Sequence, residues 1–328
     1  MQGAVLRLRD TAMRSFHDFF HSNDFVYAHT PIITSNDAEG AGESFRLAPV
    51  PSRSSSRGAA TPDSEFFNKP SYLTVSSQLH LEVLSNAVAR VWTLSPCFRA
   101  ERSQTSRHLA EFWMLEAEWA FVRSVDDLCD VAEASIKHVL RQHSPDRDLL
   151  QADIGVPWVL TAAAASEAPW ARITYTDAVY ELQKSGAHFE FTPRWGAALQ
   201  SEHERWLANT FTRGPIFVTD YPAAIKPFYM RQNDDGKTVA CFDLLVPNVG
   251  ELVGGSLREE RSTLLETAIN RQGLDEETYR WYTELRKFGG APHGGYGMGF
   301  ERLISWLGGV ENIRECIPMP RWSGRMLL

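Results

Sequence analysis

The stretch "FRAERSQTSRHLAEFWMLEAE", residues 98–118, decides the fold of this chain because its charged and aromatic side chains follow a strand pattern. Every second residue from Phe112 to Glu118 points to one face of an extended chain, and the residues between them point to the other. Both faces mix carboxylates with large apolar side chains. We therefore predict a hairpin of two strands, residues 91–99 and 111–121, with at least one face lining a cleft.

The first strand of this hairpin carries the groups that an ATP site without a phosphate loop requires. Arg99 and Glu101 share a face. The guanidinium fork of arginine suits a phosphate or a carboxylate, and a carboxylate can accept from an amine. Phe112 on the second strand can stack on a flat base. The alternative is a salt-bridged hairpin with a purely structural role, and this stretch by itself does not choose between the two.

A glycine-rich segment near the C-terminus, "GGYGMGFER" at residues 294–302, favours the ATP site. Gly295, Gly297 and Gly299 alternate, so one face of the expected strand has no side chains and allows a flat ligand or another backbone to approach. Arg302 follows in the first turn of a helix. The segment matches neither the G-x-x-x-x-G-K-[ST] loop nor the dinucleotide pattern G-x-G-x-x-G.

Two acidic residues in "FDLLVPNVGELVGGSLRE", residues 242–259, suggest a metal. Asp243 and Glu251 lie on either side of a turn that contains proline and glycine. Hard oxygen ligands of this kind suit Mg²⁺ bound together with a nucleotide phosphate. Isolated acidic pairs are usually only solvated, so this pair gains weight from the phosphate-binding groups elsewhere.

Composition excludes several classes of protein. The chain has 328 residues, of which 43% are hydrophobic and 23% are charged, as in ordinary globular proteins. The net charge of −8 argues against strong non-specific binding to nucleic acid. The four cysteines show no C-x-x-C spacing and are expected to be reduced thiols. We find no membrane span or secretory signal and predict a cytoplasmic protein, with the mitochondrial matrix as the alternative.

The order of the elements predicts an α+β fold. The first 21 residues form an amphipathic helix whose apolar side chains recur at spacings of three and four. The strands come mostly in neighbouring pairs, which favours a mainly antiparallel sheet flanked by helices. We expect a single domain over residues 1–328 with a mobile Ser/Pro-rich insertion at 49–68. A strand is expected at 228–231, a helix at 202–211 and irregular chain at 144–171.

These stretches resemble the signature motifs of class II aminoacyl-tRNA synthetases, specifically the asparaginyl member of the aspartyl, asparaginyl and lysyl group. Residues 98–118 resemble motif 2 and residues 294–303 resemble motif 3. Residues 24–43, "DFVYAHTPIITSNDAEGAGE", resemble motif 1 and the loop that closes over the substrate. The stretches "LTVSSQLHLE", "VTDYPAAIKPFYM" and "ENIRECIPMPR" also resemble the asparaginyl enzyme. The resemblance runs from about residue 5 to about residue 325 and implies the class II catalytic fold and a homodimer through motif 1.

The resemblance implies a role for each matching residue. The residues implied in binding ATP are Arg99, Glu101, Arg107, His108, Phe112, Glu251 and Arg302. The residues implied in binding the amino acid are Glu39, Gln78, Arg99 and Arg258. The ligands implied for Mg²⁺ are Asp243 and Glu251. Arg99 and Arg302 are the expected catalytic residues, because they would neutralise charge on the reacting phosphates.

Two positions favour asparagine over aspartate as the amino acid. Aspartyl enzymes carry a lysine three positions after the glutamine that matches Gln78, and Leu81 stands there in this chain. The loss of that cation disfavours a carboxylate and suits a neutral carboxamide. Gly254, where aspartyl enzymes have serine, indicates the same.

The expected reaction is ATP-dependent activation of asparagine to asparaginyl-AMP with release of pyrophosphate. Members of the family carry an N-terminal anticodon-binding barrel, and this chain starts at the helix that enters motif 1, so we expect no such domain here. The interpretation we prefer at this point is a stand-alone paralogue that passes the acyl group to a small amine or ammonia. The alternatives are a genuine asparagine–tRNA ligase, an aspartate-activating asparagine synthetase, and a non-enzymatic protein built on a synthetase fold.

Overall fold

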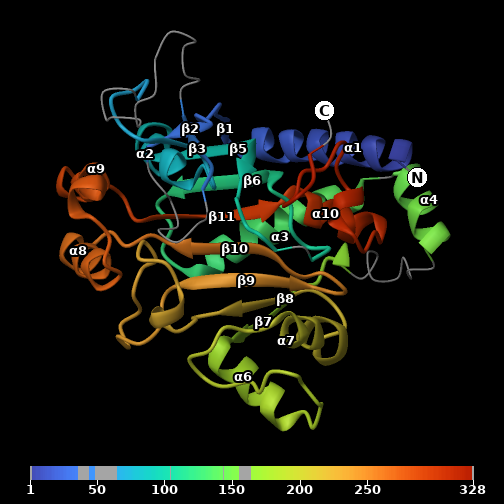
Figure 1. Cartoon of the computed structure of the whole chain (residues 1–328). Helices are drawn as coiled ribbons and strands as arrows, with labels where there is room; N and C mark the ends of the chain where they lie inside the picture. The colour runs from blue at the N-terminus through green and yellow to red at the C-terminus, as the bar shows by residue number, and fades with distance from the viewer. Residues whose placement is uncertain are drawn as a thin grey trace.

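The computed structural model describes residues 2–35, 44–48, 65–103, 105–142, 144–154 and 164–326. An eight-stranded sheet runs through the centre of the molecule (Figure 1). Its strands follow the order β1 (Val26–Tyr27), β5 (Arg90–Phe98), β6 (Glu111–Ala120), β11 (His293–Gly299), β10 (Gly250–Leu257), β9 (Cys241–Val246), β8 (Ile216–Thr219) and β7 (Ala171–Thr174). The two outermost pairs are parallel and the others are antiparallel. The predicted α+β class with a mainly antiparallel sheet is confirmed.

Helices and a second small sheet surround this sheet. The helices are α1 (Gln2–Ser22), α2 (Gln78–Val88), α3 (Val125–Arg141), α4 (Pro145–Ile154), α6 (Tyr175–Lys184), α7 (Ser201–Trp206), α8 (Ser262–Arg271), α9 (Glu276–Lys287) and α10 (Phe300–Gly308). The small sheet has the order β2 (Ile33–Thr34), β4 (Ser71–Leu73), β3 (Arg46–Leu47). Helices α1, α3, α4 and α10 pack together on one face of the large sheet, and α8 and α9 lie beyond one end of its strands (Figure 1).

Helix α1 forms because one of its faces is apolar along its whole length. The apolar residues that give the predicted spacing of three and four are all buried, namely Val5, Leu8, Ala12, Phe16, Phe19 and Phe20. Phe20 stacks on Trp92 of β5 with ring centroids 4.5 Å apart, and Phe16 meets Phe300 of α10 edge to face. Burial of these rings ties the N-terminal helix to the sheet and to the helix that follows β11.

Strand β6 divides the molecule into a core side and a pocket side. Leu115 and Trp119 belong to the main hydrophobic cluster, whereas Met114, Glu116 and Glu118 line a cavity on the opposite face. The period of two predicted for this strand is therefore observed, and the carboxylates of Glu116 and Glu118 lie on the face away from the helical layer.

The glycine alternation in β11 has a steric cause that the structure shows directly. A Cβ on Gly295 would lie 2.1 Å from the carbonyl oxygen of Ala117 and 2.2 Å from Oε2 of Glu118. A Cβ on Gly297 would lie 3.2 Å from Sδ of Met114. The side chains of β6 thus lie across the bare face of β11, and any larger residue there would push them out of the cavity floor.

Three predictions of local structure need correction. Residues 144–171 were expected to be irregular, but they include α4 and the start of β7. Residues 228–231 form a turn with a single bridge between Met230 and Arg258 instead of a strand. The helix expected over 202–211 is split into α7 and a π-helical turn, Leu207–Phe211.

The predicted insertion at 49–68 lies outside the described residues up to position 64. In the described part of the chain, no helix is both long and apolar enough to cross a membrane. The single-domain division stays a prediction.

Candidate active site

A cavity of about 530 Å³ opens on the pocket side of the sheet and is lined by residues of β6, β9, β10 and β11. The predicted site residues that line it are Gln78, Arg99, Glu101, Arg107, His108, Phe112, Asp243, Glu251, Arg258 and Arg302. The remaining one, Glu39, lies outside the described residues. The chain thus brings together residues that are up to 224 positions apart, as the span from Gln78 to Arg302 shows.

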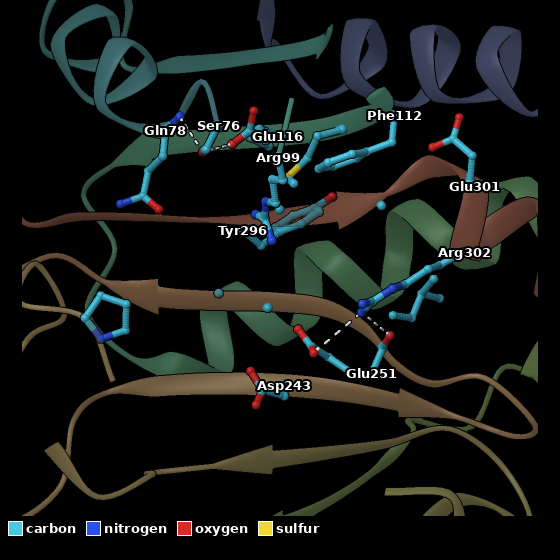
Figure 2. A pocket seen from close by; sticks show the side chains of 18 of the residues that line it. Ser76, Gln78, Arg99, Phe112, Glu116, Asp243, Glu251, Tyr296, Glu301 and Arg302 are labelled. Atoms are coloured by element: carbon cyan, nitrogen blue, oxygen red, sulfur yellow. Dashed lines mark hydrogen bonds and ion pairs between the residues drawn. The ribbon is translucent and has the colours of Figure 1, made fainter. Parts of the chain in front are cut away.

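Arg99 and Phe112 face each other at the end of the predicted hairpin (Figure 2). The guanidinium carbon of Arg99 lies 5.4 Å from the centroid of the Phe112 ring. The backbone N–H of Arg99 donates to the carbonyl of Ala110 at 3.0 Å, which closes the loop between the strands. On that loop, Nε2 of His108 lies 3.3 Å from Oε2 of Glu101. This part of the cavity therefore offers a flat ring, a cation and a carboxylate side by side.

Glu116 fastens the N-terminus of α2 to the sheet. The hydroxyl of Ser76 and the backbone N–H of Ser77 (2.8 Å) both donate to its carboxylate. Ser76 Oγ in turn accepts from the backbone N–H of Gln78 at 3.1 Å (Figure 2). Burial raises the pKa of Glu116, and the two donors and the nearby charge of Arg99 oppose that rise. A helix N-terminus is a favourable place for a carboxylate, so Glu116 places Gln78 at the edge of the cavity.

Asp243 and Glu251 approach each other from neighbouring strands across Gly254. A Cβ on this glycine would lie 3.5 Å from Oδ1 of Asp243 and 3.5 Å from Oε1 of Glu251. The donor set, two carboxylates that converge over a residue without a side chain, fits a hard divalent cation such as Mg²⁺. Nζ of Lys226 donates to both oxygens of Asp243, at 2.8 and 3.0 Å. Burial alone would lower the pKa of Lys226, but Asp243 raises it above its usual range.

Cations surround the other carboxylate of this pair. Nη1 of Arg302 donates to the carbonyl oxygen of Glu251 at 3.0 Å and lies 3.5 Å from its Oε2 (Figure 2). Although burial works against ionisation, Arg302 and the neighbouring cations hold the pKa of Glu251 below its usual range. Arg107 donates through Nη2 to the carbonyl of Val249 at 2.7 Å and through Nη1 to Ser201. These positive groups form a rim suited to a polyphosphate.

Glu204 of α7 is a third acid at this rim. Its Oε2 accepts from the backbone N–H of Glu251 at 3.1 Å. Burial and the charge of Glu251 raise the pKa of Glu204 to about 7. Gly250 makes this contact possible: with φ of +84° it adopts the left-handed region, and a Cβ there would lie 2.5 Å from Oε2 of Glu204.

Glu118 and Arg258 form a fork-to-fork ion pair at the opposite end of the cavity. Nε of Arg258 donates to Oε1 of Glu118 at 3.0 Å, and Nη2 donates to Oε2 at 2.8 Å. Nη1 donates to Oγ of Ser256 at 2.7 Å. Burial raises the pKa of Glu118, and Arg258 opposes that rise. Both residues are almost completely buried, yet both line the cavity.

Sequence reasoning missed several residues of this site. Lys226 lies in the stretch "VTDYPAAIKPFYM", which resembles the asparaginyl enzyme. No pattern in the sequence, however, predicts that Lys226 pairs with Asp243. Glu116 and Glu118 were placed on the face of Phe112 without a partner. Their partners lie just before α2 (Ser76 and Ser77) and just after β10 (Arg258), and only the tertiary fold brings these segments to β6. Glu204 has no local signal.

Comparison with known proteins identifies the family to which this chain is similar. Residues 1–323 match the family described as class II tRNA synthetases (D, K and N). The asparagine–tRNA ligase of Thermosynechococcus vestitus is 47% identical over 98% of this chain and 71% of its own length. The human asparaginyl-tRNA synthetase is 48% identical over 99% of this chain and 68% of its own length.

Solved structures give the same result for the fold. The crystal structure of asparaginyl-tRNA synthetase from Pyrococcus horikoshii complexed with asparaginyl-adenylate superimposes with a TM-score of 0.87 at 31% identity, over 99% of this chain and 70% of that chain. The Entamoeba histolytica enzyme in complex with asparaginyl-adenylate gives 0.82 at 32% identity, over 99% and 68%.

Proposed function

The chain belongs to the class II tRNA synthetases of the aspartate, lysine and asparagine group, which makes it an ATP-dependent ligase, and we propose that within this group it is an asparagine–tRNA ligase. It activates asparagine to asparaginyl-AMP and transfers the asparaginyl group to tRNA(Asn). The observation that carries the proposal is that ten residues assigned from the family motifs line one cavity. The relatives at 43–49% identity are named as tRNA ligases or synthetases, so transfer to a small amine or ammonia, the interpretation preferred from the sequence, gains no support.

The activation step needs no side-chain base in this proposal. The asparagine α-carboxylate is already ionised and attacks the α-phosphorus of ATP in line, and pyrophosphate leaves. The chain contributes orientation and neutralisation of charge. Arg99 would contact the α-phosphate and the attacking carboxylate, and the adenine would stack on Phe112, 5.4 Å from the Arg99 guanidinium. Arg302 and Arg107 would hold the outer phosphates.

Asp243 and Glu251 would hold Mg²⁺ in this proposal. The bound ion would supply positive charge to the phosphate oxygens of ATP. Burial raises the pKa of Asp243, and Lys226, which donates to both of its oxygens, opposes that rise. Arg302 flanks Glu251 and would hold it in place beside the phosphates.

The Glu118–Arg258 pair supports asparagine as the amino acid. A carboxamide offers an N–H donor and a carbonyl acceptor, which match a carboxylate acceptor and a guanidinium donor. An aspartate side chain would bring a second carboxylate against buried Glu118, where like charges repel strongly. Gln78, fixed at the N-terminus of α2 by the bond from its N–H to Ser76, would accept from the α-ammonium group.

We also propose a homodimer that forms through the segment resembling motif 1. Val26, Tyr27, Ile32 and Ile33 are large apolar residues that are 37–48% exposed in the single chain. β1 is an edge strand of the large sheet. An exposed apolar cluster beside an open edge is typical of a protein interface. Sedimentation equilibrium tests this: the twofold mass is expected for the wild type and the single-chain mass for Val26→Asp. A monomeric wild type would refute the dimer.

One experiment tests the function. Pyrophosphate exchange into ATP is measured with asparagine and with aspartate, and transfer from the preformed adenylate is then followed in a single turnover to tRNA(Asn), to ammonia and to small amines. We expect exchange with asparagine and transfer to tRNA. Exchange without charging of tRNA would refute the proposed tRNA ligase and favour transfer of the acyl group to a small amine. Exchange with aspartate alone would favour asparagine synthesis, and no exchange with either amino acid would refute activation altogether.

A further inference from the structure

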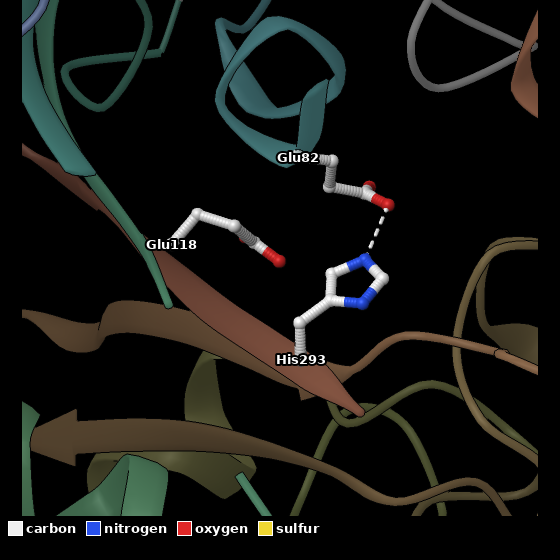
Figure 3. Close-up of side chains that lie close together, drawn as sticks. All are labelled: Glu82, Glu118 and His293. Atoms are coloured by element: carbon white, nitrogen blue, oxygen red, sulfur yellow. Dashed lines mark hydrogen bonds and ion pairs between the residues drawn. The ribbon is translucent and has the colours of Figure 1, made fainter. Parts of the chain in front are cut away.

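Behind the asparagine end of the cavity lies a buried cluster of ionisable side chains, of which the proposed function uses only Glu118. Glu82, Glu118 and His293 each place one oxygen or nitrogen atom within 4.8 Å of the others (Figure 3). Glu118 lines the cavity, whereas Glu82 on α2 and His293 at the start of β11 lie behind its wall. Glu82 has no exposed surface.

The cluster has ligand types that could hold a metal, but its surroundings disfavour a cation. Nη2 of Arg286 donates to Oε2 of Glu82 at 2.9 Å, and Arg258 donates to both carboxylate oxygens of Glu118. A divalent ion would bring further positive charge beside two buried guanidinium groups, and repulsion between like charges is strong in a buried site. The cluster is therefore an ion network.

Glu82 is the centre of this network. The hydroxyl of Tyr282 lies 2.9 and 2.8 Å from its two oxygens, and Nε of Arg258 lies 3.9 Å from Oε1. Burial alone would raise the pKa of Glu82, but Arg286, His293 and Arg258 hold it well below its usual range. The carboxylate is thus charged, and it connects α9 to the pair that faces the substrate side chain.

His293 contributes a positive charge to the network. Nε2 lies 3.1 Å from Oε2 of Glu82, and Nδ1 lies 3.1 Å from the carbonyl oxygen of Ala291. Both partners are acceptors, so both ring nitrogens must carry a hydrogen for the two bonds to form, and that species is the imidazolium. Burial lowers the pKa of His293, but the bond to Glu82 and its charge outweigh burial and raise it.

Glu82 also acts directly on a residue that lines the cavity. Nε2 of Gln78, one helical turn earlier, donates to Oε1 of Glu82 at 3.2 Å. An ionised carboxylate can only accept, so this bond fixes the side-chain amide of Gln78 with its nitrogen toward Glu82. The amide oxygen is then left for a donor in the cavity, and the α-ammonium group of an amino acid is such a donor.

We propose that Glu82 is a positioning residue for the amino acid. It does not line the cavity itself, but it orients the side-chain amide of Gln78 and helps to hold Arg258 in place beside Glu118. The inference rests on the proposed activation of asparagine. It joins the two parts of the amino-acid site, the α-ammonium contact and the side-chain contact, through one carboxylate. The ATP end of the cavity has no part in this network, so loss of Glu82 acts on asparagine and spares ATP.

The test measures KM for each substrate in pyrophosphate exchange with Glu82→Gln. This variant keeps the size of the side chain, removes its charge and can offer an amide nitrogen to Gln78. We expect KM for asparagine to rise about tenfold or more, because hydrogen bonds to charged groups are lost, with KM for ATP within about twofold. Calorimetric titration with asparagine should show the same loss of affinity.

The matched control is Glu133→Gln. Glu133 is also buried and also forms an ion pair, with Lys137 at 2.6 Å on α3, but it does not line the cavity. Both variants should melt at lower temperature, and only Glu82→Gln should raise KM for asparagine. In a Gln78→Ala background the further effect of Glu82→Gln should be clearly smaller, because the two residues act together.

The outcomes separate this inference from the proposed function. A wild-type protein without asparagine-dependent exchange refutes the function itself. Wild-type exchange with an unchanged KM for asparagine in Glu82→Gln, or equal changes in KM for both substrates, overturns the role of Glu82 alone. If Glu82→Gln does not fold, Tyr282→Phe removes one donor to the same carboxylate and should raise KM for asparagine about threefold while sparing ATP; no change would overturn the proposal.

Discussion

Arg258, which directly follows β10, and Glu118 of β6 are joined by two parallel hydrogen bonds of 3.0 and 2.8 Å across the intervening strand β11. The contact passes over Gly295, where a Cβ would lie 2.2 Å from the Glu118 carboxylate. A glycine in the middle of β11 is therefore a condition for the pair that faces the asparagine side chain.

Glu118→Gln should abolish asparagine-dependent exchange and destabilise the protein by about 3–5 kcal/mol, because it leaves the charge of buried Arg258 unpaired. Thermal or denaturant unfolding gives the stability and pyrophosphate exchange gives the activity. The double variant Glu118→Leu/Arg258→Met removes both charges and should recover most of the stability without recovering exchange. If Glu118→Gln retains asparagine-dependent exchange, the Glu118–Arg258 pair does not bind the asparagine side chain.

Arg99→Ala should lower the rate of exchange by about 10²–10³-fold or more, since one preorganised cation at the reacting phosphate is lost. The fold should stay intact by circular dichroism and melting. Arg102→Ala is the control, because Arg102 lies three residues further along the same hairpin, is exposed and does not line the cavity. Equal loss in the two variants would indicate a general effect on the loop.

Glu251→Gln should raise the Mg²⁺ concentration that gives half-maximal exchange by about tenfold, since one charged oxygen ligand becomes a neutral amide. Magnesium titration of the initial rate is the measurement, and removal of the metal with EDTA should stop exchange in the wild type. Glu277→Gln, on the exposed surface of α9, should leave the titration unchanged. A Glu251→Gln curve that overlies the wild-type curve would remove Glu251 from the metal site.

The parts of this structure that a single sequence could predict are those set by local pattern. α1 extends as its spacing of apolar residues predicts, and its buried face is the predicted one. β5 and β6 begin and end within one residue of the predicted hairpin strands. In each case the signal is a period of 3.6 or 2, and it lies within one element.

The parts that could not be predicted depend on contacts between distant segments. Glu118 and Arg258 are 140 residues apart, and Glu82 and His293 are 211 apart. Pattern alone placed Glu118 on the correct face, but it could not supply Arg258 as the partner. The resemblance to the family supplied positions for the site residues, and it gave no indication of Lys226 or Glu82, whose partners are other side chains of the chain itself.

The charge of His293 makes the stability of the network depend on pH. Its pKa in the folded chain lies above the ordinary value of about 6.5 for histidine. Protonation therefore favours the folded state: the contribution is fully present below about pH 6.5 and is lost as the pH rises through the raised pKa. The melting temperature of the wild type should exceed that of His293→Gln by the largest margin at pH 6 and by a smaller one at pH 9. A margin that grows with pH would mean that His293 is neutral in the folded protein, and Glu82 would then lack one of its cations.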